Sequence, residues 1–100
     1  MIRHTLMWKF CDSLDGMDKD GIINLVEGKL YDLKPIIPEI ISMKVERDIL
    51  RSERSFDMLY IAEFESLEAL ERYRIHPEHV KVAEFIARAR VAQAVCDSEI

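Results

Sequence analysis

Hydrophobic and polar residues alternate along the first eleven positions of the chain. One side of the segment Ile2–Cys11 carries large apolar groups and one imidazole: Ile2, His4, Leu6, Trp8 and Phe10. A period of two residues is typical of a β-strand with one face toward a core. The pattern therefore predicts a first strand whose apolar face also presents a histidine.

Three later segments place apolar residues at helical spacing. The first runs from Ile22 to Leu33, follows a polar stretch, Asp12–Asp20, that we expect to be a loop, and ends before Pro35. The second begins after Ser66, a residue suited to the N-cap, and ends at His76, because a residue before proline disfavours the α region. Pro77 suits the first position of a third helix that continues to Ala89.

Three further strands are predicted at Ile41–Glu46, Phe56–Phe64 and Val91–Cys96. Arg47–Ser55, between the first two of them, is expected to be a loop. The order β-α-β-β-α-α-β is the ferredoxin-like plan, an α+β fold with one antiparallel four-stranded sheet. Right-handed crossovers place all helices on one face of that sheet. We expect a single domain over residues 1–100.

The opposite face of the sheet is predicted to be partly apolar. Met7, Leu59 and Ile61 point to that side, although Lys44 and Glu46 keep its edge polar. A small domain that leaves apolar sheet surface uncovered gains stability by burying it against a second copy. We therefore expect a homodimer that pairs two sheets.

Composition narrows the possible partners and location. The chain is 49% hydrophobic and 33% charged, with a net charge of −5 and basic residues interleaved with acidic ones. A nucleic-acid site requires a basic face, so we expect no nucleic-acid partner. No apolar run approaches the length of a membrane span and no signal peptide is apparent, so the expected location is cytoplasmic. Cys11 and Cys96 are expected to be small buried apolar groups rather than a disulfide.

Candidate catalytic side chains lie around the break between the last two helices. His79 falls in the first turn of the third helix, where the positive helix end favours neutral imidazole, and Tyr73 lies one turn before the break. A neutral imidazole beside a phenol suits acid–base work on a carbonyl compound. Two alternatives stay open: the histidines only cap and pack, or His76, Glu78 and His79 bind a metal.

The first and third strands also offer a possible ligand wall. Trp8 and Tyr60 share the side of the sheet that His4 occupies, where ordinary core packing is the alternative to ligand contact. Asp57, Glu63 and Glu65 are expected to be solvent-facing or capping charges.

Several motifs together resemble the stress-responsive A/B-barrel (Dabb) family. They are Ile2-Arg3-His4-Thr5-Leu6 with Lys9-Phe10, Phe56-Asp57, Phe64-Glu65-Ser66, Ala69-Leu70, Tyr73 and His76-Pro77-Glu78-His79-Val80. The resemblance implies a ferredoxin-like fold that dimerises into an α+β barrel. It also implies chemistry like that of the family's plant polyketide cyclase, which closes a ring by aldol condensation without metal or cofactor.

The same resemblance assigns roles to individual residues. His79, Tyr73 and His4 match the cyclase's catalytic positions, and the expected ligand contacts are Leu6, Trp8, Tyr60 and His76. A tryptophan at position 8 would reshape the pocket, and Glu46 stands where many relatives carry glycine. We expect binding of a small, partly apolar carbonyl or aromatic compound, with a cofactor-free cyclase, lyase or isomerase and a ligand-free interaction module as the alternatives.

Overall fold

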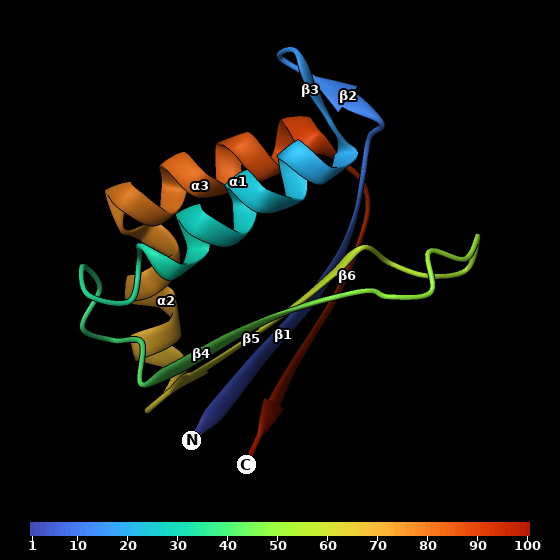
Figure 1. Ribbon diagram of the computed structural model, residues 1–100. Helices are drawn as coiled ribbons and strands as arrows, with labels where there is room; N and C mark the ends of the chain where they lie inside the picture. The colour runs from blue at the N-terminus through green and yellow to red at the C-terminus, as the bar shows by residue number, and fades with distance from the viewer.

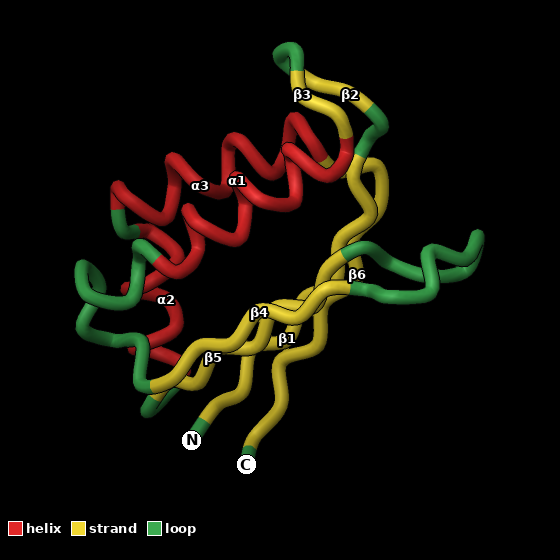
Figure 2. Tube along the Cα trace, in the orientation of Figure 1, coloured by secondary structure: helices red, strands yellow, loops and turns green.

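The computed structural model describes residues 1–100, with three helices packed over one face of a curved sheet (Figures 1 and 2). In chain order the elements are β1 (Ile2–Phe10), β2 (Ser13–Leu14), β3 (Met17–Asp18), α1 (Lys19–Tyr31), β4 (Ser42–Arg47), β5 (Met58–Phe64), α2 (Leu67–Ile75), α3 (Pro77–Ala89) and β6 (Arg90–Glu99). Figure 1 shows the two termini beside one another, where the backbone N–H of Ile100 donates to the carbonyl of Met1. No helix is both long and apolar enough to pass through a membrane.

The large sheet has the strand order β4-β5-β1-β6, and every neighbouring pair is antiparallel. This topology, with all helices on one side, is the ferredoxin-like α+β fold that the sequence predicts. The register joins Leu6 to Tyr60 on one side of β1 and to Val95 on the other. Residues at the same register position share a face, so alternate residues of β1 and β5 are buried under the helices.

Helix boundaries follow local capping. The Asp18 side chain accepts a hydrogen bond from the N–H of Gly21 at the start of α1, and Ser66 does the same for Ala69 at the start of α2. His76 ends α2 and caps α3, whose first residue is Pro77. The predicted break at His76 is therefore confirmed, and it lies at one end of the helical layer.

Two expectations are wrong, one about a loop and one about the bounds of the last strand. Asp12–Asp20 is not a simple loop, because β2 and β3 form a small hairpin whose turn residues Asp15 and Gly16 have φ of 51° and 80°. Two consecutive positive φ values define the tight hairpin turn that Asp-Gly favours. The last strand spans Arg90–Glu99 rather than Val91–Cys96, because it pairs with β1 over almost its whole length. The expectation of buried thiols is also wrong, since Cys96 on this strand is exposed and Cys11 is only partly buried.

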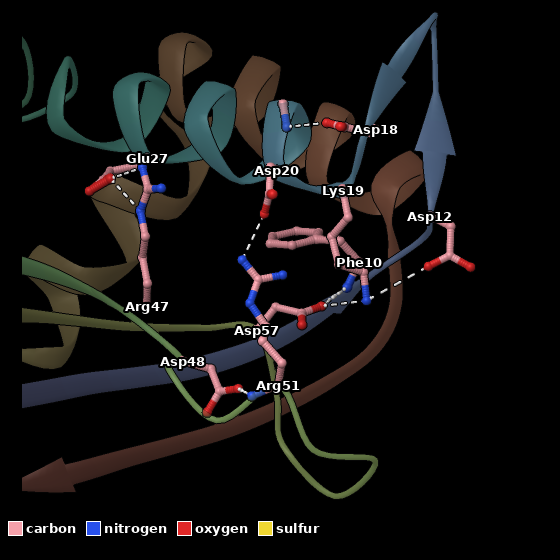
Figure 3. Close-up of polar contacts among 11 residues, drawn as sticks. Phe10, Asp12, Asp18, Lys19, Asp20, Glu27, Arg47, Asp48, Arg51 and Asp57 are labelled. Carbon is pink, nitrogen blue, oxygen red and sulfur yellow. Dashed lines mark hydrogen bonds and ion pairs between the residues drawn. The ribbon is translucent and has the colours of Figure 1, made fainter.

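Asp57 is a further correction, because it is buried rather than solvent-facing. It is only 7% exposed, and its Oδ2 accepts a hydrogen bond of 2.8 Å from the backbone N–H of Phe10. Lys19 approaches the same oxygen at 3.3 Å, so the carboxylate connects the end of β1 to the start of α1 (Figure 3). A buried charge requires such partners. In the same view, Arg51 joins the loop after β4 to Asp20 on α1.

The face of the sheet away from the helices keeps apolar groups at its centre. Met7 is 37% exposed there, and Leu59 and Ile61 are half-buried. Their surroundings are charged: Arg3 pairs with Glu63, and Lys44 lies beside Ile61 in the register. The apolar centre of this outer face is thus bordered by charges toward β4 and at the end that carries Arg3 and Glu63, whereas its neighbours on β6 are uncharged.

Candidate functional site

A cavity of about 330 Å³ lies between the helix-facing side of the sheet and α3. Its size falls within the range of small-molecule sites in proteins. Leu6, Val82, Ile86 and Val95 supply apolar wall. Polar side chains reach it from β1, α2, α3 and β6, and they are His4, Arg74, His79, Arg90, Gln93 and Asp97, with the phenols of Tyr60 and Tyr73.

Strand register places a carboxylate beside the histidine of β1. His4 pairs with Asp97 across β1 and β6, and Nδ1 of His4 lies in hydrogen-bond contact with Oδ1 of Asp97. An ionised carboxylate can only accept, so Nδ1 carries the hydrogen and donates it. In the neutral imidazole the lone pair then sits on Nε2. The pair joins a largely buried imidazole to an exposed acid at the cavity wall.

The break between α2 and α3 fixes the state of His79. Its Nδ1 lies 2.9 Å from the carbonyl oxygen of Arg74, and a carbonyl only accepts, so Nδ1 is the protonated nitrogen. Burial lowers the pKa of His79, against the opposing effect of the Arg74 carbonyl and with a smaller contribution from His4. The ring is therefore neutral at pH 7, with its Nε2 lone pair available at the cavity.

Two buried tyrosines meet on the wall between these histidines. The hydroxyls of Tyr60 and Tyr73 are 2.8 Å apart, and each side chain is 1% exposed. Burial raises the pKa of Tyr73 to about 12 and that of Tyr60 well above its ordinary value. Both phenols thus stay protonated. Because only one hydrogen lies between the two oxygens, the other remains available to a ligand.

The aromatic rings bring these groups together. The Tyr73 and His79 ring centroids are 4.3 Å apart, and the His4 centroid is 6.3 Å from those of both Tyr60 and Tyr73. Residues from β1, β5, α2 and α3 therefore converge on one end of the cavity. At this end two imidazoles and two neutral phenols surround the same space.

The other end of the cavity is lined by Trp8 and Gln93. The indole Nε1–H of Trp8 donates to Oε1 of Gln93 at 2.8 Å, and the Trp8 ring stacks on Tyr60 with a centroid separation of 5.9 Å. Trp8 is only 3% exposed. It contributes both to the core and to the wall, so the two interpretations of this residue are compatible.

Comparison with known proteins agrees with this architecture. The family model for the stress-responsive A/B barrel domain matches residues 2–100. The chain belongs to that family. No curated protein matches the chain.

Solved structures resemble this A/B barrel protein over nearly its whole length. A dimeric ferredoxin-like protein of unknown function from Bacteroides fragilis is 23% identical, with a TM-score of 0.86 and coverage of 99% of this chain and 95% of that one. A hydroxynitrile lyase from Passiflora edulis is 18% identical, with a TM-score of 0.85 and coverage of 99% and 92%. A Dabb family protein from Mesorhizobium loti is 22% identical, with a TM-score of 0.68 and coverage of 99% and 95%. At these identities the likeness shows the fold alone.

His76 is the one predicted site residue of this A/B barrel protein that lies outside the cavity wall. Its Nδ1 accepts the N–H of Glu78 at 3.1 Å, so the imidazole serves as the N-cap of α3. No group of three or more His, Cys, Asp or Glu side chains is placed to hold a metal ion. The structure brings His4, Tyr73 and His79 together with Leu6, Trp8 and Tyr60 and gives His76 a separate structural role.

Sequence reasoning missed the contribution of β6 to the site. Gln93, Val95 and Asp97 recur every second residue and face the cavity opposite Trp8, Leu6 and His4. The alternation of these residues is visible in the sequence, but Gln93 and Asp97 are polar. Polar residues at positions that face inward suggest that the strand has ended. The signal became interpretable only with the register to β1.

Proposed function

We propose that this A/B barrel protein binds a small, partly apolar carbonyl compound and moves a proton on it without a cofactor. The observation that carries the proposal is the state of His79: a neutral ring with Nδ1 satisfied by Arg74 and Nε2 available at a cavity. A general base needs an accessible lone pair and a pKa at or below the working pH. His79 meets both conditions.

The neighbouring groups suit the other half of such a step. When Nε2 of His79 takes a proton from the carbon next to a carbonyl, the C–H electron pair forms an enolate and negative charge develops on the carbonyl oxygen. A neutral phenol such as Tyr73, in ring contact with His79, can donate a hydrogen bond to that oxygen. Return of the proton to another atom gives isomerisation. Attack of the enolate carbon on a second carbonyl forms a carbon–carbon bond and an alkoxide, and the proton on His79 then passes to that alkoxide to give an aldol product.

His4 and Asp97 form a second acid–base unit on the opposite wall. The carboxylate accepts the Nδ1–H of His4 and so holds the imidazole in one tautomer and one orientation. His4 would therefore position the carbonyl end of the ligand or act as the second proton carrier. Neither role requires a metal or cofactor.

Deuterium exchange tests the proposal whatever product the reaction forms. A panel of ketones, keto acids and keto esters is incubated with the protein in D₂O and followed by proton NMR. Loss of an α-proton signal with wild type, and its retention with His79→Gln, is the expected result; roughly a hundredfold slower exchange corresponds to loss of a general base.

The control for this experiment lies on the same helix. Lys81→Gln alters an exposed residue of α3 that faces away from the cavity, and it should exchange at the wild-type rate. Exchange that is equally fast in His79→Gln would remove His79 as the base. If no panel member exchanges, the catalytic part of the proposal is rejected.

We also propose that the protein is a homodimer formed through the outer face of the sheet. Support comes from the apolar centre at Met7, Leu59 and Ile61 and from its charged border. Pairing two such faces would bury the apolar residues in a symmetric contact. Each protomer would keep its own cavity, because the cavity lies on the other side of the sheet.

A further inference from the structure

Hydrogen-bond donors and acceptors are unevenly distributed along the cavity. His4 and Trp8 mark its two ends on β1, four residues apart, which corresponds to roughly 13 Å along a strand. The wall between them is formed by apolar groups, including Leu6 and Val95. The polar groups at the two ends differ in what they can offer a ligand.

At the Trp8 end, Gln93 has unused donors. The indole N–H only donates, so it is the amide oxygen of Gln93 that faces it. The Nε2 group of Gln93 has no partner in the protein, although Gln93 lines the cavity. Its two N–H bonds are therefore available to a ligand.

Arg90 adds a cation at the same end. It lies opposite Phe10 at the start of β6, beyond the Trp8–Gln93 pair, and it lines the cavity. Every arginine except Arg54 and Arg90 takes part in an ion pair. Arg54 belongs to the exposed loop after β4, so Arg90 is the unpaired guanidinium of the cavity. Its five N–H donors match a carboxylate in a planar, two-pronged contact.

The His4 end has the opposite character. Both imidazoles use Nδ1–H on protein acceptors, the neutral ring of His79 presents a lone pair, and Asp97 contributes a negative charge. Arg74 lies at this end, but its guanidinium is 3.7 Å from Glu71. At this end Asp97 would repel an anionic ligand group, whereas a ligand group that donates a hydrogen bond or a proton would find an acceptor.

We infer that the cavity takes an elongated ligand with a carboxylate bound by Arg90 and Gln93 and a carbonyl end that meets His4 and His79. The inference rests on the proposed function, since it concerns the same cavity, and it names the substrate class as medium-chain oxo acids with an apolar middle. The two ends of the cavity are roughly 13 Å apart along β1, and side chains that reach inward shorten the space left for a ligand. A chain of about six to eight carbons between the carboxylate and the carbonyl fits that space.

Binding of one matched pair of probes tests this subsite without any turnover. The probes are 8-oxononanoate and its methyl ester, which keep the chain and the ketone and differ in the charge of the far end. Calorimetry on wild type should give a Kd for the acid roughly tenfold lower than for the ester, as expected for a charge-assisted contact. In Arg90→Gln the two Kd values should become equal through weaker binding of the acid.

Two further variants make the result specific. Arg88→Gln removes a nearby arginine that pairs with Asp15 and does not line the cavity, and it should keep the tenfold preference. In Gln93→Glu the new carboxylate still accepts the Trp8 N–H but adds negative charge, so binding of the acid should weaken far more than binding of the ester. Thermal melts of each variant show that the fold is intact.

Three outcomes would overturn the subsite: no binding of either probe, equal Kd values in wild type, or an unchanged acid preference in Arg90→Gln. Failure of the catalytic proposal is recognised separately. An acid preference that depends on Arg90, in a protein that exchanges no α-proton, would uphold the carboxylate subsite and reject catalysis by His79.

Discussion

The carbonyl oxygen of Arg74 accepts a hydrogen bond from Nδ1 of His79 across the break between α2 and α3. Arg74 is in the last turn of α2, where carbonyl groups lack partners within the helix, and His79 is in the first turn of α3. Pro77 makes the break, since it favours the first position of a new helix. A local helix break thus selects the tautomer of a cavity histidine.

The lowered pKa of His79 predicts how stability depends on pH. At pH values between the folded and the unfolded pKa, the unfolded chain binds more protons at this position than the folded protein does. The free energy of unfolding therefore falls as the pH is lowered through this window. The groups around the ring are Arg74, His4 and His76, and burial is the largest cause. The folded pKa lies below 6.5, and from pH 7 down to that pKa the free energy of unfolding changes by at most about 1.4 kcal/mol per pH unit for this one proton.

Urea unfolding of wild type and His79→Gln at several pH values between 7.5 and 5 measures this dependence. Wild type should lose more stability than the variant as the solution is acidified, because glutamine does not titrate. Equal losses in the two proteins would show that protonation of His79 is not linked to folding.

The contact between His4 and Asp97 predicts a role for Asp97 in positioning the imidazole. In Asp97→Ala the Nδ1–H of His4 loses its acceptor, so the ring should populate both tautomers and rotate more freely. Nitrogen chemical shifts of the His4 ring report the tautomer, and exchange activity should fall roughly tenfold, as for loss of a charge-assisted hydrogen bond. Glu99→Ala, on the same strand but outside the cavity wall, is the control. A single unchanged tautomer in Asp97→Ala would argue against the role.

The order of strands and helices could be predicted because each element carries its own periodic signal. β1 alternates strictly, and the break at His76-Pro77 follows from the proline alone. The hairpin of β2 and β3 was also accessible, since Asp15-Gly16 is a strong two-residue turn signal, but the strands on either side are too short to show alternation.

The missed residues depend on contacts between distant segments. Asp57 is buried because Phe10 and Lys19, far away in the sequence, bring it a backbone N–H and a cation. Asp97 reaches the site because β6 pairs with β1 in one particular register. Neither partner can be recognised from the neighbours of these residues in the chain, because a charged residue in a strand is by default expected to face solvent.

Loss of the Asp57 carboxylate should destabilise the fold. Asp57→Ala leaves the buried N–H of Phe10 without an acceptor and Lys19 without its nearest acid (Figure 3). The expected loss in the free energy of unfolding is about 1–3 kcal/mol, measured by urea denaturation. Asp12→Ala removes the other, fully exposed partner of Lys19, 3.9 Å away, and should change stability by less than about 0.5 kcal/mol. A loss in Asp57→Ala no greater than in this control would contradict the structural role.

The proposed dimer predicts a change in mass after a single substitution on the outer face. Leu59 lies between Met7 and Glu46 in the register, so Leu59→Asp places a charge in the apolar centre and beside an existing acid. Sedimentation at micromolar concentration should show wild type at twice the mass of one chain and Leu59→Asp at the mass of one chain, with its circular dichroism unchanged. The control is Leu67→Asp, which alters an exposed leucine in the first turn of α2, where an acid is favourable. Dimers that persist in Leu59→Asp, or a wild-type protein that sediments as one chain, would show that the outer face does not join two copies.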